Sequence, residues 1–244
     1  MENISYIVGS GPSLWNLSKK NVEFINSSKF ILSFNKHIIF YEDIGIIPTH
    51  YLLADCHKKA IFTLREVLRK INDPMLKDIK LFLSKQLIIS AAKVFGKEQL
   101  SLALRSRNVT LIERTHWLKG GAWAKKMSDP IFHYRGSLSG CINISSLLNP
   151  SHKLVLVGVD LHNHTYFFNH HLERDSKRWA PFLVRVLPET TGNETICEYK
   201  GFPGIDHAFP FMRNKVEALG GELLVACKNS LLYQNGILRS FEIP

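Results

Sequence analysis

The feature that most constrains the fold is a short apolar run that ends at a polar residue or glycine and is followed by a helical pattern, repeated along the chain. Runs of four to six apolar residues bounded by turn residues predict strands. Alternation of such strands with helices is typical of an α/β fold with a Rossmann-like, doubly wound and mostly parallel sheet. The predicted strands are residues 4–8, 30–33, 50–54, 80–84, 109–113, 153–157 and 222–227.

The run at residues 153–157 is the most informative of these strands. Its sequence, Lys-Leu-Val-Leu-Val, lacks the polar alternation of a half-exposed strand and predicts a central strand covered on both faces. Ligands of doubly wound sheets bind outside the carboxyl ends of the strands, where the strand order reverses. We therefore expect the polar residues that end the runs to meet at one edge of the sheet and to form the functional site.

Composition narrows the class of protein. The chain has 244 residues, 45% of them hydrophobic, which is enough for a large core. Its apolar runs are far shorter than the roughly 20 residues of a transmembrane helix, and it starts without a signal-peptide pattern, so we expect a soluble, cytoplasmic protein. The four cysteines form no C-x-x-C pair, and neither a disulfide framework nor a zinc knuckle is expected.

The net charge of +10 favours anionic partners such as nucleotides, acidic glycans or an anionic membrane face. The basic residues occur as scattered doublets rather than as one tract, and no nucleic-acid-binding motif accompanies them. We therefore expect no specific nucleic acid partner.

Two small-residue turns precede predicted helices. In Gly9-Ser10-Gly11-Pro12-Ser13 the glycines allow close backbone approach, and the N–H groups of the following helix end can bind phosphate or hydroxyls. The third glycine of G-x-G-x-x-G is missing, and the second strand ends at Asn35 instead of an acidic residue, which disfavours an NAD enzyme. The turn Ser137-Leu138-Ser139-Gly140 is either a ligand-binding helix end or a simple N-cap.

Five short motifs follow one another along most of the chain: G-S-G-P-S-L at residues 9–14, S-F-N-K at 33–36, S-G at 139–140, G-V-D-L-H at 158–162 and N-S-L-L at 229–232. In this order they resemble the sialyltransferases of glycosyltransferase family 42 and the related motility accessory factor glycosyltransferases. The resemblance implies a variant of the glycosyltransferase-A fold. It also implies metal-independent transfer of sialic acid, or a related nonulosonic acid, from a CMP-sugar donor to a glycan, with no further cofactor.

The resemblance implies a nucleotide site built from the ends of the predicted strands and from the second small-residue turn. The family more usually has asparagine at two of these positions, Ser10 and Asp55. The implied nucleotide-binding residues are Gly9, Ser10, Gly11, Ser13, Asn35, Asp55, Ser139, Gly140 and Asp160.

The implied catalytic residues come from the segment after the G-x-D motif. Family tyrosines there hold the donor phosphates; here His162 replaces one and Tyr166 supplies the other, and either group can donate a hydrogen bond to the departing phosphate. The family's general base is a histidine just after the lid, which implies His207; Asp206 or another acid can orient its imidazole ring. The alternative is that His207 is a helix residue without chemistry, with His164 as the reserve base.

We predict three regions. Residues 1–162 form the nucleotide-sugar-binding α/β core, residues 163–204 an irregular lid and acceptor segment, and residues 205–244 complete the core. The resemblance further implies a bacterial surface polysaccharide or lipid-linked glycan as acceptor. The basic surface favours peripheral association at the inner face of the cytoplasmic membrane. It leaves open whether the chain forms a homo-oligomer.

Three rival functions remain. A pterin pyrophosphokinase shares the G-x-G-P-S-L and G-x-D-L motifs and requires ATP and magnesium. A metallohydrolase is suggested by the alternating Asp160, His162 and His164, with His170 and His171 nearby, although our interpretation assigns no metal ligand. A binding module that keeps the fold without a catalytic base is the third.

Overall fold

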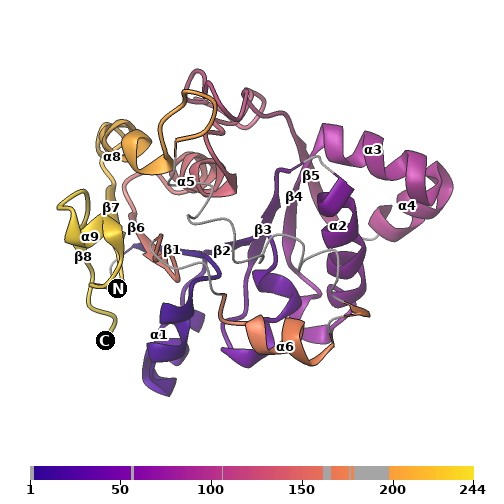
Figure 1. The fold of residues 1–244 in the computed structure, drawn as a ribbon, viewed down its shortest axis with the longest axis horizontal. Helices are drawn as coiled ribbons and strands as arrows, with labels where there is room; N and C mark the ends of the chain where they lie inside the picture. Colours follow the sequence, from indigo (N-terminus) through magenta and orange to yellow (C-terminus); the bar gives the residue numbers. More distant parts are fainter. Residues whose placement is uncertain (1–2, 56–57, 106, 162–165, 176, 179–197) are drawn as a thin grey trace.

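The computed structural model describes residues 3–55, 58–105, 107–161, 166–175, 177–178 and 198–244. Its centre is one eight-stranded sheet in which every paired strand is parallel to its neighbour, in the order β5-β4-β3-β2-β1-β6-β7-β8 (Figure 1). The predicted α/β, doubly wound parallel sheet is confirmed. The strands are β1 (Ile4–Val8), β2 (Ile31–Phe34), β3 (His50–Leu53), β4 (Lys80–Ser84), β5 (Asn108–Ile112), β6 (Lys153–Val157), β7 (Glu222–Val225) and β8 (Arg239–Ser240).

The strand order reverses beside β1. Strands β1 to β5 run outward in chain order on one side, and the chain then returns to place β6, β7 and β8 on the other side. At the carboxyl end of β1, Val8 pairs with Ser33 of β2 and with Val157 of β6. The switch point therefore lies between β1 and β6, where a doubly wound sheet opens its ligand crevice.

Helices cover both faces of the sheet. In Figure 1, α5 and α8 lie on one side of the strands, and α1 and α6 lie on the other. Strand side chains alternate, so Tyr6 and Val8 of β1 join one buried core while Ile7 joins the other. The helices are α1 (Lys19–Asn26), α2 (Lys58–Lys70), α3 (Lys85–Phe95), α4 (Lys97–Arg105), α5 (Ser137–Leu148), α6 (Asn169–Arg174), α8 (Phe209–Glu217) and α9 (Leu231–Gln234).

The segment after β1 differs from the prediction. We expected a helix directly after the glycine turn, but the structure has a short 3₁₀ helix, η1 (Pro12–Asn16), and α1 begins only at Lys19. The N-cap residue Ser18 explains the restart, because its Oγ accepts a hydrogen bond from Asn21 N at 3.1 Å and the Asn21 side chain binds back in a capping box. The glycine turn is therefore followed by the short η1, and Leu17 and Ser18 separate η1 from α1.

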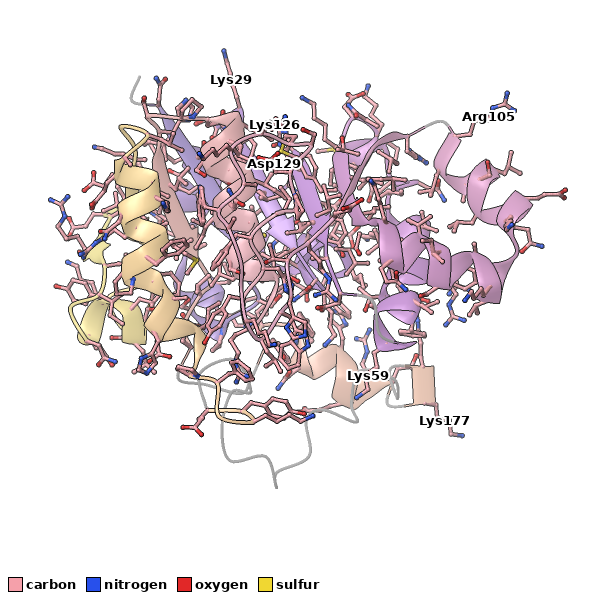
Figure 2. The ribbon with its side chains drawn as sticks, turned by 90° about the horizontal axis from the view of Figure 1, so that it is seen from above. Lys29, Lys59, Arg105, Lys126, Asp129 and Lys177 are labelled. Atoms are coloured by element: carbon pink, nitrogen blue, oxygen red, sulfur yellow. The ribbon has the colours of Figure 1, made fainter. Side chains whose placement is uncertain are left out.

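Other expectations concern the membrane, the cysteines and the surface charge. Among the described residues, no helix combines the length and apolar composition needed to cross a bilayer. Cys141 and Cys227 are free thiols, whereas the other two cysteines lie outside the described residues. Lys29, Arg105 and Lys177 project from different parts of the surface (Figure 2), so these cations do not form one tract.

Candidate functional site

The glycine turn after β1, residues 9–13, is hydrogen-bonded to the end of β6. Gly9 N donates to Val157 O and Gly11 N donates to Gly158 O, both at 2.8 Å. A Cβ on Gly9 would lie 2.4 Å from Gly158 O, and a Cβ on Gly11 would lie 2.3 Å from Asp160 Oδ2. Because real Cβ contacts are essentially never this short, both positions require glycine.

Asp160 fixes the same turn from the β6 side. Its carboxylate is 3% exposed, and Oδ2 accepts a hydrogen bond from Ser13 N at 2.9 Å. The N–H groups of Gly9, Gly11 and Ser13 thus donate hydrogen bonds to the end of β6 and to Asp160. Ser10 is half-buried at the tip of the turn. Ligand contacts of these five residues stay predictions.

Asn35 links the end of β2 to the start of α5. Its φ of 54° lies in the left-handed region, which asparagine tolerates better than most residues. Tyr51 Oη donates to Asn35 O at 2.6 Å, and Ser137 Oγ donates to Asn35 Oδ1 at 3.1 Å. A strained backbone held by two side chains at a strand end is a feature of functional sites.

The predicted turn at the start of α5 is held by contacts within the protein. Ser139 is fully buried, and its Oγ accepts from Tyr134 N at 2.8 Å and donates to Gly136 O at 2.9 Å. A Cβ on Gly140 would lie 3.3 Å from Leu52 Cδ2, so glycine lets α5 pack closely on β3. Both residues position the loop that precedes α5, and their contact with a nucleotide stays a prediction.

The sequence analysis did not predict that Asp55 and His133 influence each other. Asp55 follows β3 and is half-buried, whereas His133 is buried in the segment between β5 and α5. Burial, helped by the charge of Arg114 and opposed by Asp55, lowers the pKa of His133 to about 4. Within the described parts of the chain, His133 Nε2 has no hydrogen-bond partner. The segment lacks a strong periodic pattern, so no sequence signal identified this neutral imidazole.

Tyr166 and Phe167 come from the predicted lid and lie on the strand-end edge. Phe167 N donates to Ser10 O at 3.2 Å, and Trp15 Nε1 donates to Phe167 O at 3.0 Å. Lys36 Nζ lies 5.2 Å from the centroid of the Tyr166 ring, a distance at which a cation is attracted to the ring face. The structure therefore brings Tyr166 to the motif at the end of β2, and its contact with a donor phosphate stays a prediction.

His207 lies on a short 3₁₀ helix, η5 (Ile205–Ala208), before α8. Its side chain is 68% exposed, and Nε2 is 3.9 Å from Asp206 Oδ2. Tyr134 Oη donates to Pro203 O at 2.9 Å, which ties the residues just before His207 to the loop that precedes α5. The role of His207 as a general base stays a prediction.

Arg135 is a further candidate that sequence reasoning missed. It is buried with a left-handed φ of 57°, and its guanidinium carbon lies 5.8 Å from the Trp117 ring and 5.6 Å from the Tyr199 ring. The only sequence signal was its position at the start of the R-G-S-L-S-G turn. Burial of this cation beside two aromatic rings depends on contacts between distant segments.

Two predicted residues cannot be placed. His162 and His164 lie outside the described residues, as does much of the predicted lid, and the predicted division into three regions stays a prediction. The only histidine and carboxylate cluster with metal-ligand spacing among the described residues is Asp43, His170 and His171.

The described residues define an α/β protein with a Rossmann-like parallel sheet whose strand order reverses between β1 and β6. No protein-family model matches the chain, and no curated protein matches it significantly. The chain is similar to the solved structure of a MAf glycosyltransferase from Magnetospirillum magneticum AMB-1, with 17% sequence identity and a TM-score of 0.42 over 68% of this chain and 24% of that one. The chain thus spans about a quarter of the length of that protein. A likeness of this size carries no argument about function, which has to come from the site.

Proposed function

We propose that the chain is a glycosyltransferase that binds a CMP-linked acidic sugar, sialic acid or a related nonulosonic acid, at the carboxyl ends of β1, β2, β3 and β6. The observation that carries the proposal is the meeting of motifs that are far apart in the sequence. The turn at residues 9–13 is hydrogen-bonded to residues 157–160, and Asn35 is hydrogen-bonded to Ser137 at the start of α5. These are the segments to which the family resemblance assigns the nucleotide.

The charges at this edge suit an anionic donor. A CMP-sugar of this class carries a phosphate and a carboxylate. Lys36 lies two residues after the end of β2, and the guanidinium of Arg135 can bind a carboxylate or phosphate through two parallel hydrogen bonds. The net charge of +10 attracts such a ligand from a distance.

The proposed chemistry is a displacement at the anomeric carbon of the sugar. The acceptor hydroxyl forms the new glycosidic bond, the bond from the anomeric carbon to the phosphate oxygen breaks, and CMP leaves with its electron pair. His207 accepts the hydroxyl proton, with Asp206 orienting the ring, and Tyr166 and His162 donate hydrogen bonds to the departing phosphate. This scheme needs no metal ion in the transfer step.

The proposed acceptor is a surface polysaccharide or a lipid-linked glycan. Scattered lysines and arginines on the surface would favour an anionic membrane face, where a lipid-linked acceptor is presented.

The test is a calorimetric titration of the full chain with CMP, UMP, GDP and ATP, first with EDTA and then with magnesium. The proposal predicts selective CMP binding that does not depend on metal. Binding of ATP only with magnesium would instead indicate the phosphotransferase, and failure of every nucleotide to bind would reject both.

A variant pair sharpens the test. Asn35→Gly keeps the left-handed backbone and removes the side chain, so the affinity for CMP should fall about tenfold, which is the effect of one lost hydrogen bond. The matched control is Ser151→Gly, at another left-handed position, with φ 66°, before the amino end of β6. Equal CMP affinity in both variants would remove Asn35 from the site.

A further inference from the structure

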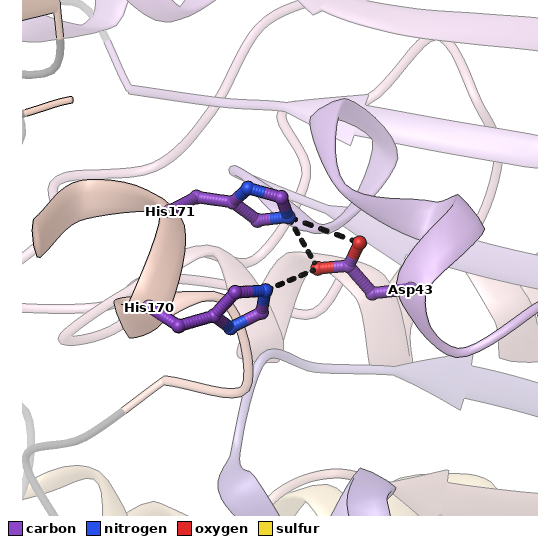
Figure 3. Close-up of side chains that lie close together, drawn as sticks. All are labelled: Asp43, His170 and His171. Atoms are coloured by element: carbon purple, nitrogen blue, oxygen red, sulfur yellow. Dashed lines mark hydrogen bonds and ion pairs between the residues drawn. The ribbon is translucent and has the colours of Figure 1, made fainter. Parts of the chain in front are cut away.

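Three potential metal ligands converge on the face of the sheet that carries α1 and α6. Asp43 ends the 3₁₀ helix η3 (Tyr41–Asp43), and His170 and His171 belong to α6. His171 Nε2 lies 3.0 Å and 2.8 Å from the two carboxylate oxygens of Asp43, and His170 Nε2 lies 3.6 Å from Oδ2 (Figure 3). One ligand atom from each residue lies within 4.8 Å of the other two.

We propose that Asp43, His170 and His171 bind a transition-metal ion, with Zn²⁺ as the best fit. Zinc binds imidazole nitrogen and carboxylate oxygen at about 2.0–2.2 Å, so tetrahedral ligand atoms lie about 3.3 Å apart. The measured separations of 2.8 Å and 3.6 Å bracket this value, and small side-chain rotations make them equal. Magnesium and calcium prefer all-oxygen ligand sets and fit two imidazoles poorly.

The surroundings of the cluster hold the two rings in place. The His171 ring stacks on Phe40 at a centroid distance of 5.1 Å, and the His170 ring lies 6.0 Å from the Trp15 ring. Asp43 and His171 are mostly covered, whereas His170 is about half exposed. Solvent therefore reaches one side of the cluster, and water completes the tetrahedron as the fourth ligand.

The position of the cluster gives the ion a structural role. Metal binding ties α6 to η3, just after Phe167, which contacts the glycine turn at Ser10. On the far side of α6, Arg178 Nη2 lies 3.4 Å from Glu66 Oε2 on α2. The ion thus holds the start of the predicted lid against the core. It lies beside the proposed nucleotide site and takes no part in the proposed transfer chemistry.

The experiment measures the metal content of the full chain, a readout that does not depend on glycosyl transfer. The EDTA-treated protein is titrated with ZnCl₂, CoCl₂ and MgCl₂ by calorimetry, and bound metal is counted by mass spectrometry after desalting. We expect one zinc per chain, no magnesium, and a cobalt absorption spectrum typical of four-coordinate nitrogen and oxygen ligands. Zinc should also raise the melting temperature, because the ion binds the folded state.

Single substitutions test which residues bind the zinc ion. Asp43→Asn and His171→Asn should each weaken zinc binding by more than the roughly 10 to 100-fold that changes outside the ligand shell cause. His116→Asn, at an exposed histidine outside the cluster, is the matched control and should bind zinc as the parent does. Far-UV circular dichroism checks that all three variants fold.

Two results would overturn the proposal. If the parent binds no stoichiometric zinc, the cluster is only a hydrogen-bonded pair of Asp43 and His171. If zinc binds tightly to the parent and equally tightly to Asp43→Asn and His171→Asn, the ion lies elsewhere on the chain. A sulfur-to-cobalt charge-transfer band would likewise assign the metal to cysteines and contradict the proposal.

Discussion

Replacement of Gly9 by alanine tests whether the contact between the ends of β1 and β6 determines the stability of the site. The added Cβ would lie 2.4 Å from Gly158 O and 3.1 Å from Val159 Cγ2. The carbonyl belongs to the backbone at the end of β6 and cannot rotate away as a side chain could. To reach even 3.0 Å, the two strand ends have to separate by about 0.6 Å, the difference between 3.0 Å and 2.4 Å.

The expected loss in free energy of unfolding follows from the hydrogen bonds and packing contacts that this separation strains. The hydrogen bonds from Gly9 N to Val157 O and from Gly11 N to Gly158 O each contribute about 0.5–1.5 kcal/mol. Forcing an extra methyl group into a packed site adds about 1–3 kcal/mol. We expect Gly9→Ala to lower the free energy of unfolding by about 4 kcal/mol, which is roughly a 1,000-fold change in the folding equilibrium constant.

The assay is urea unfolding followed by far-UV circular dichroism, with Gly236→Ala as control. Gly236 has a left-handed φ of 66° but nothing within 4 Å of an added Cβ, so alanine there costs only about 1–2 kcal/mol of backbone strain. The steric reasoning would be refuted if Gly9→Ala were no more destabilising than Gly236→Ala.

Three further predictions concern titration, a buried ion pair and the proposed base. Burial lowers the pKa of His37 to about 3 and of His133 to about 4. As the pH falls, these histidines therefore bind protons in the unfolded state before they do so in the folded state. The free energy of unfolding should decrease as the pH drops from 6.5 towards 4. At pH 5 each histidine should lower the free energy of unfolding by about 2 kcal/mol. In His37→Phe, the urea midpoint should therefore change less with pH between 6.5 and 4 than it does in the parent. Glu66→Ala should lower the free energy of unfolding by about 1–3 kcal/mol, since the carboxylate is buried beneath three arginines, and an unchanged midpoint would contradict this. His207→Ala should abolish transfer from a CMP-sugar while leaving CMP affinity unchanged, and His116→Ala should affect neither; residual transfer near the parent rate would exclude His207 as the base.

The sequence predicted the sheet more completely than it predicted the candidate site. Residues 80–84 and 153–157 were predicted as strands with the same bounds that the structure has, because a strand covered on both faces leaves a continuous apolar run. The prediction of a helix directly after the glycine turn was wrong because the backbone becomes extended at Leu17, with φ −73° and ψ 129°, and the Ser18 capping box then begins α1 as a separate helix. Asp43 was missed altogether, since only tertiary packing brings it to His170 and His171.

The hydrogen bonds of the glycine turn bear on how the proposed nucleotide site would work. In a dinucleotide-binding sheet, backbone N–H groups at this turn hold the pyrophosphate. Here the N–H groups of Gly9, Gly11 and Ser13 bind the end of β6, and η1 separates the turn from α1. We therefore expect the proposed nucleotide site to use side chains at the strand ends, among them Asn35, more than the amides of Gly9, Gly11 and Ser13. Asn35→Gly should therefore weaken binding at a smaller cost in stability than Gly9→Ala, because it removes one side-chain hydrogen bond, the one from Ser137 Oγ, and keeps the left-handed backbone.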